Sequence, residues 1–332
     1  MSLLFLDGVD SYHTIGGALY GVSAPNIGYT ISQTSSGDSQ VTIGPGTNTS
    51  SRAFAIGRSL AGSSRVSKQI AIGGTKFVIG FAMNATGRQS ILKLTNLFEV
   101  LWPSNGLPVI NGVAGPTIPI LNTWYYWEFV VDKVAKTVDV WLNGYQQFQS
   151  TFTADVPSVV EMSWGWNAAG DVAAVFIDDI YVLDDTSTGS NSKTARLGPI
   201  QIATRLPTST THSEWAPTPS SKESWKIVSQ IPALQNEYVE SNVIGAYDLY
   251  ASSTTVTAEV IAVAVSALTA KTDIDQHAIS LVMSNGNTVV EGAPIDLSTQ
   301  YTYVQSVFEG DVNGTPWTPA TASAVNFGIK VK

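Results

Sequence analysis

The sequence predicts an all-β protein built from two β-sandwich domains. Short segments in which apolar and polar residues alternate recur along the chain, separated by Gly, Pro, Asn and Ser. Charged residues make up only 13% of the 332 residues, about half the usual share, and Ser, Thr, Gly and Asn stand in their place. No segment of useful length keeps a clear helical period. Together these observations favour sandwiches or jelly rolls.

Two strands and the start of a third are predicted over residues 124–144, WYYWEFVVDKVAKTVDVWLNG. Alternation marks strands at 124–131 and 137–142, and the polar residues between them have the length of a hairpin connection. Asn143-Gly144 suits a turn because both residues tolerate positive φ. Core packing explains the aromatic residues. The alternative is a sugar-binding surface, for which Trp141 is the best candidate because it lies opposite the Val/Leu row.

Further strands are expected on the same grounds in both halves of the chain. In the first half they span residues 29–34, 69–71, 76–83, 90–94, 97–101, 159–166 and 173–183. In the second half they span 247–252, 258–266, 277–283, 302–309 and 326–331, with short helical turns around 220–228 and 232–240. The polar stretch DDTSTGSNSKTARLG predicts a linker. We therefore expect domains at 1–185 and 199–332, joined by residues 186–198.

Composition argues against several classes of partner. The net charge is −9 and no cluster of Lys and Arg is present, which disfavours a nucleic-acid groove. The chain has no cysteine, so it has neither disulfides nor thiolate metal sites and suits a reducing cytoplasm. The N-terminus lacks the features of a signal peptide. The longest apolar stretch, 256–268, is too short and too polar to span a membrane.

Three features together resemble a known family. Trp124, an aliphatic strand and VDVWLNG resemble the centre of laminin-G-like, concanavalin-A-type jelly rolls. Residues 173–209, AAVFIDDIYVLDDTSTGSNSKTARLGPIQIATRLPTS, resemble a junction in bacteriophage virion proteins. The C-terminal segment from residue 260, with Trp317-Thr318 before a final FGIKV strand, resembles the β-domain that follows this junction.

The resemblance implies a non-enzymatic structural protein on the exterior of a phage particle, made in the bacterial host cytoplasm. Its expected fold is a concanavalin-A/laminin-G-like jelly roll followed by a β-sandwich. The expected partners are other virion proteins of the capsid or tail and further copies of itself, as a homotrimer. Capsid decoration, head fibre, collar and tail fibre all stay open. The alternative is an adhesin that binds host surface glycans.

A glycan-degrading enzyme is the third interpretation, and the sequence contains few residues that support it. A retaining glycosidase needs two carboxylates about 5 Å apart. Strand VVEMSWGW offers only Glu161, and we expect Asp178 and Asp179 to point to opposite faces because they are neighbours on a strand. Neither a Gly-x-Ser-x-Gly elbow, nor clustered zinc ligands, nor a phosphate loop is present. The three histidines, His13, His212 and His277, are therefore expected to be surface or strand residues.

Two groups of residues remain as candidate sites. Calcium, the possible cofactor, would use Asp178 and Asp179, because laminin-G-like sandwiches often hold Ca²⁺ at one rim. The alternative is that both aspartates accept loop amides. A glycan would use an aromatic platform with neighbouring amides, and the candidates are Trp141, Asn143, Trp164 and Trp166. Core packing also explains the indoles and is the preferred interpretation, so an exposed indole would decide for the glycan platform.

Overall fold

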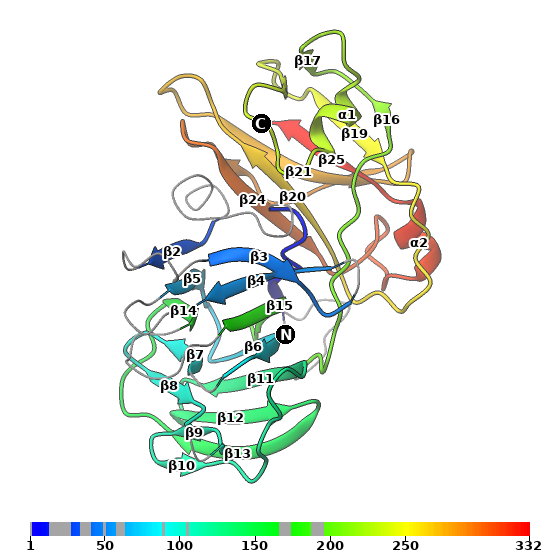
Figure 1. Cartoon of the computed structure of the whole chain (residues 1–332). Helices are drawn as coiled ribbons and strands as arrows, with labels where there is room; N and C mark the ends of the chain where they lie inside the picture. Colours follow the sequence, from blue (N-terminus) through cyan, green and yellow to red (C-terminus); the bar gives the residue numbers. More distant parts are fainter. Residues whose placement is uncertain are drawn as a thin grey trace. The chain divides into compact units, whose positions relative to one another are not determined.

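The computed structural model describes residues 2–12, 28–33, 41–48, 51–57, 64–87, 90–103, 106–165, 174–186 and 196–332. The chain is all-β, as predicted, and divides into two compact units (Figure 1). The first unit extends to Ala203 and the second is formed by Thr204–Lys332. Residues 196–203 thus belong to the first unit, beyond its expected end at residue 185. Within the described residues, no helix is long and apolar enough to cross a membrane.

The first unit is a sandwich of two antiparallel sheets. The described strands of the larger sheet run in the order β13-β12-β11-β6-β15-β4-β3, with β1 also paired to β15. Their bounds are β1 Ser2–Asp7, β3 Val41–Pro45, β4 Arg52–Gly57, β6 Lys76–Ala85, β11 Tyr125–Asp132, β12 Thr137–Leu142, β13 Tyr145–Thr151 and β15 Ala174–Asp184.

The second sheet has the order β10-β9-β8-β7-β14-β5-β2. Its strands are β2 Thr30–Gln33, β5 Ser64–Ala71, β7 Ser90–Leu94, β8 Phe98–Leu101, β9 Val109–Ile110, β10 Val113–Ala114 and β14 Val159–Gly165.

Alternation in the sequence places the core between these sheets. In β12 the burial pattern alternates strictly, with Val138, Val140 and Leu142 buried. Across the sandwich, the ring of Trp164 meets that of Phe81 edge-on, with the centroids 5.5 Å apart. The apolar row of the predicted hairpin is therefore part of the interior. Its turn also forms as expected, because Asn143 and Gly144 have φ values of 49° and 85°.

The second unit has one main sheet and two short ribbons. The main sheet runs β16-β19-β25-β21-β22, with β23 also paired to β21, and the ribbons are β17-β18 and β20-β24. The elements are β16 Ser209–His212, β17 Ala216–Thr218, α1 Ser224–Val228, β18 Tyr238–Glu240, β19 Tyr247–Ala251, β20 Val263–Thr269, β21 Ala278–Ser284, β22 Val289–Glu291, β23 Ile295–Asp296, β24 Thr302–Phe308, α2 Pro319–Ala324 and β25 Asn326–Val331.

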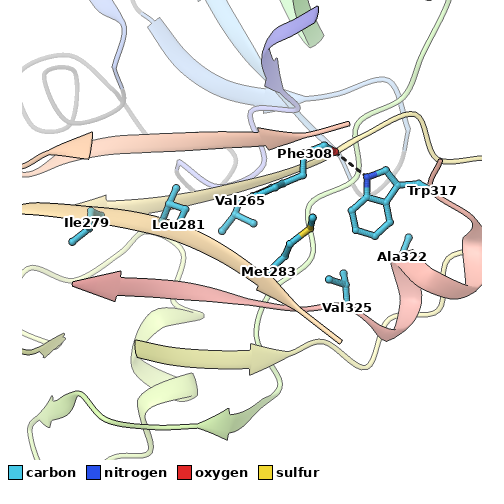
Figure 2. Close-up of a cluster of buried hydrophobic side chains, with 8 residues drawn as sticks. All are labelled: Val265, Ile279, Leu281, Met283, Phe308, Trp317, Ala322 and Val325. Carbon is cyan, nitrogen blue, oxygen red and sulfur yellow. Dashed lines mark hydrogen bonds between the residues drawn. The ribbon is translucent and has the colours of Figure 1, made fainter. Parts of the chain in front are cut away.

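The core of the second unit lies between β21, the β20-β24 ribbon and α2 (Figure 2). Trp317 closes one end of this core, and its Nε1 donates to the carbonyl oxygen of Phe308 at 2.9 Å. Helix α2 begins directly afterwards, because the Thr318 hydroxyl accepts from the backbone nitrogen of Thr321 in a capping box. The Trp-Thr pair noted in the sequence thus ends the ribbon and starts the helix.

The two expected helical turns have different outcomes. Residues 224–228 form α1, inside the predicted range 220–228. The prediction for 232–240 is wrong, because this stretch contains no helix and ends in strand β18. Strand β18 pairs with β17, and this tertiary pairing overrides the weak local preference.

Candidate functional site

A polar cluster lies on the outer face of strands β12 and β13. Asp139 Oδ1 accepts from Gln146 Nε2 at 3.0 Å and from Gln149 Nε2 at 2.8 Å. Both glutamines are exposed. Asp139 pairs directly with Gln149, and Trp141 pairs with Gln146, so these residues share one face. We call Asp139, Gln146 and Gln149 the β12–β13 polar cluster.

Trp141 lies beside this cluster but is covered on one side. The guanidinium carbon of Arg196 lies 3.5 Å from the centroid of the Trp141 ring, a cation–π contact. The side chain is half-buried, and its indole nitrogen has no hydrogen-bond partner. Trp141 is therefore partly covered beside the polar cluster and does not form the open platform that the sugar-binding alternative requires.

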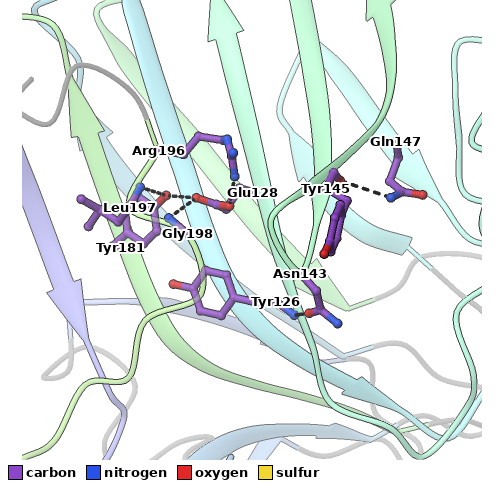
Figure 3. A network of polar contacts seen from close by, with 9 residues as sticks. All are labelled: Tyr126, Glu128, Asn143, Tyr145, Gln147, Tyr181, Arg196, Leu197 and Gly198. Carbon is purple, nitrogen blue, oxygen red and sulfur yellow. Dashed lines mark hydrogen bonds and ion pairs between the residues drawn. The ribbon is translucent and has the colours of Figure 1, made fainter. Parts of the chain in front are cut away.

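Arg196 is held in place by the buried carboxylate of Glu128 on β11 (Figure 3). Glu128 also accepts from the Tyr181 hydroxyl at 2.6 Å and from the backbone nitrogen of Gly198 at 2.9 Å. Gly80 makes room for this arrangement, because a Cβ there would lie 2.0 Å from the Tyr181 ring. Burial, and then the neighbouring charge of Glu128, raise the pKa of Tyr181, so its hydroxyl stays a donor.

Asp178 and Asp179 do not point to opposite faces, which corrects the expectation from alternation. The register of β15 against β6 shifts between Asp178 and Tyr181, and Asp179 has φ of 52°. This β-bulge turns both carboxylates toward one hydroxyl. Thr47 Oγ1 lies 3.2 Å from Asp178 Oδ2 and 3.0 Å from Asp179 Oδ2.

The two carboxylates are buried and surrounded by donors. Asp178 accepts from the backbone nitrogen of Thr47 at 2.9 Å and from the Ser51 hydroxyl at 3.2 Å, and Asp179 accepts from the backbone nitrogen of Ile202 at 2.7 Å. Burial and then the charge of Asp179 raise the pKa of Asp178 to about 7. Burial raises the pKa of Asp179 to about 6. The pair therefore ties the β3–β4 turn and residues 196–203 to strand β15.

These contacts favour the loop-amide alternative, and calcium at Asp178 and Asp179 stays a prediction. Calcium takes six to eight oxygen ligands. The oxygens of Asp178 and Asp179 instead accept from N–H and O–H groups, as in the alternative considered from the sequence. Across the described ranges, no group of three or more His, Asp or Glu side chains could hold a metal ion.

The remaining glycan candidates divide into three cases. Trp164 is fully buried in the core, so a glycan cannot reach it, and core packing explains this residue. Trp166 lies outside the described residues. Asn143 is exposed, but its Oδ1 accepts from the backbone nitrogen of Tyr126 at 2.8 Å and stabilises the β12–β13 turn.

The histidines do not form a catalytic arrangement with a serine in the part of the chain that the structure describes. His212 stacks on Tyr247 with the ring centroids 4.1 Å apart, and its Nε2 lies 3.4 Å from Glu214. The Nε2 of His277 lies 2.9 Å from Asp273 at the surface. His13 falls outside the described residues.

Sequence reasoning missed most of the residues that build this face. Gln146, Gln149 and Arg196 carry no local signal, since surface glutamines are common and Arg196 falls in the expected linker. Glu128 does carry one. It is a carboxylate inside an aromatic strand, opposite Trp141 in the predicted hairpin, and a buried carboxylate requires partners.

Comparisons with known proteins give likenesses of shape only. No family model matches the chain. No curated protein matches it either. Similar solved structures include a sialidase (12% identity, 48% of this chain and 17% of the sialidase, TM-score 0.39).

They also include a Lotus tetragonolobus seed lectin (10% identity, 54% of this chain and 96% of the lectin, TM-score 0.36). A third is the enzymatically active domain of tailspike protein 4 of bacteriophage CBA120 (17% identity, 52% of this chain and 21% of that chain, TM-score 0.28). This chain thus spans a small part of the sialidase and of the tailspike. All three TM-scores lie below 0.5, so we base the proposed function on the chain's own geometry.

Proposed function

We propose that the protein binds carbohydrate through the outer face of strands β12 and β13. The observation that carries the proposal is the exposed polar cluster of Asp139, Gln146 and Gln149 next to the Trp141–Arg196 stack. A sugar ring carries hydroxyl groups at its edge and C–H groups on its faces. Carboxylates and amides match the hydroxyls, and the accessible part of the half-buried Trp141 ring can pack against the C–H groups.

The site is built on rigid elements. Asp139 and Trp141 belong to β12, which pairs with β11 on one side and β13 on the other. Arg196 is fixed by Glu128, so the indole and the guanidinium keep their positions without a ligand. A surface that is ordered in advance loses less conformational entropy on binding. The proposal concerns binding and, as the sequence predicts, includes no chemical step.

Glycan-array screening of the full chain, followed by calorimetry on the hits, tests the proposal. Replacing both glutamines in Gln146→Ala/Gln149→Ala should weaken binding at least tenfold, because each lost hydrogen bond contributes about 1 kcal/mol. Gln276→Ala is the matched control, since Gln276 is an exposed glutamine near Asp296 in the second unit. Binding that survives the double substitution, or no binding to any glycan, would contradict the proposal.

Protein–protein contact within an assembled particle is the second candidate, and the exposed apolar loops of the second unit favour it. Val243, Ile244 and Ile274 are 61%, 82% and 93% exposed. They precede β19 and β21, and both strands begin beside the end of β25. Apolar side chains grouped at one end of a sheet are typical of contact surfaces.

The phage-particle location and the homotrimer stay predictions of this second candidate. Light scattering of the purified chain tests the trimer. A stable trimer that Ile244→Asp dissociates would support it, and a monomer at every concentration would contradict it.

A further inference from the structure

The charge and hydrogen-bonding capacity of the β12–β13 polar cluster specify the class of glycan, and this step rests on the proposed function. Asp139 is held by amides alone. In the described part of the chain, no lysine or arginine forms an ion pair with it, whereas Lys76 pairs with Asp132, Lys136 with Asp155 and Arg196 with Glu128. Asp139 therefore leaves an uncompensated negative charge at the centre of the cluster.

The cluster also offers several acceptors around the charge of Asp139. A carboxylate only accepts hydrogen bonds, so each glutamine must turn its Nε2 toward Asp139. That orientation uses one of the two N–H donors of each amide and leaves one N–H donor and the Oε1 acceptor on each glutamine. The second oxygen, Oδ2 of Asp139, is a further acceptor. The three neighbouring acceptors are therefore the two Oε1 atoms and Oδ2 of Asp139. A ligand that satisfies them must bring several donors, and the vicinal hydroxyls of a sugar do so.

The nearby guanidinium does not change this balance. Arg196 directs its charge into Glu128, and the flat face of the guanidinium covers Trp141. A carboxylate or sulfate on a sugar would therefore meet the charge of Asp139 without an available cation. We infer that the face selects neutral, hydroxyl-rich glycans and rejects anionic ones such as uronates or sialylated chains.

Affinity ratios test this inference. Calorimetry of the full chain would compare a neutral oligosaccharide found on the array with the same oligosaccharide carrying one uronate or sialic acid. We expect the neutral form to bind at least fivefold tighter, because two like charges about 4 Å apart in water repel by roughly that factor. Asp139→Asn keeps the shape and the hydrogen-bonding oxygen while removing the charge, so the ratio should fall toward one. Salt should reduce the wild-type ratio in the same direction by screening.

The controls separate this inference from the proposed function. Asp296→Asn, beside Gln276 in the second unit, removes an exposed carboxylate that also lies near a glutamine amide, and it should leave the ratio unchanged. Tighter binding of the anionic form, or a ratio that Asp139→Asn does not alter, would overturn the inference while carbohydrate binding at this face stands. Absence of binding to every glycan would overturn both. Circular dichroism of each variant confirms that it is folded.

Discussion

Replacing Asp179 with asparagine should flatten the dependence of stability on pH between about 4 and 7. Asp179 is 2% exposed and its carboxylate shares Thr47 with Asp178. Burial raises its pKa to about 6 from the ordinary 3.8, and the charge of Asp10 acts in the same direction. Asparagine suits this position because it tolerates the positive φ and keeps an oxygen for the Ile202 nitrogen.

The sign of the pH dependence follows from proton binding to Asp179 in the folded and the unfolded chain. The unfolded chain ionises this aspartate near pH 4, whereas the folded chain does so near pH 6. Stability from the protonated form is therefore complete below about pH 4 and is lost as the pH rises through 6. The difference of about two pH units corresponds to about 3 kcal/mol for Asp179. Asp178, with a pKa of about 7, acts in the same sense, and removing the charge of Asp179 also lowers the pKa of Asp178.

Denaturant unfolding of the full chain at several pH values measures this effect. Hydrogen exchange in peptides from β15 localises it to the first unit. Asp139→Asn is the control, because Asp139 belongs to the same unit but is only half-buried. Some slope should remain in Asp179→Asn, since burial also raises the pKa of Asp7. A change in unfolding free energy between pH 4 and 7 that stays within about 1 kcal/mol of the wild-type change would refute the reasoning.

Four further predictions concern packing, the buried ion pair and metal independence. Trp164→Ala should lower the free energy of unfolding of the first unit by about 3–5 kcal/mol, because the ring is fully buried against Phe81; a loss below 1 kcal/mol would show that the site relaxes. Glu128→Ala should cost about 3–5 kcal/mol by leaving Arg196 unpaired, and should speed proteolysis within residues 196–203; unchanged cleavage would contradict the anchoring role. Trp317→Phe should destabilise only the second unit, by about 1–3 kcal/mol, since the carbonyl of Phe308 loses its donor; equal destabilisation of both units in denaturant unfolding would argue against this. A chelator should leave the melting temperature unchanged, and a rise on adding calcium would support a metal site at the buried aspartate pair.

Alternation in the sequence located the sheet strands well where neighbours support the local pattern. Strand β12 has the predicted bounds 137–142, and β25 has the predicted bounds 326–331. Both lie inside sheets, where one face or both must be buried, so the period of two is strongly imposed. Strand β20 begins at Val263 instead of residue 258. It belongs to a two-stranded ribbon, where pairing with β24 alone sets its limits.

The expected linker shows a different limit of sequence reasoning. Residues 196–198, Arg-Leu-Gly, end the polar and unpatterned stretch of the expected linker, yet they hold the first unit together through Glu128 and the Tyr181 hydroxyl. The sequence signal for this contact lies in Glu128 and not in residues 196–198. A carboxylate buried on β11 requires donors, and nothing local to residues 196–198 shows that they supply them.

Both polar groupings on the first unit depend on β-bulges, which alternation cannot show. In a regular strand, Gln146 and Gln149 would point to opposite faces because they are three residues apart. The register of β12 against β13 shifts between Val140 and Trp141, so Gln147 becomes an extra residue and both glutamines reach Asp139. The bulge in β15 likewise brings Asp178 and Asp179 to one hydroxyl. A bulge costs ladder hydrogen bonds and is common near functional sites. One that gathers three polar side chains on an exposed face is therefore better explained by binding than by stability.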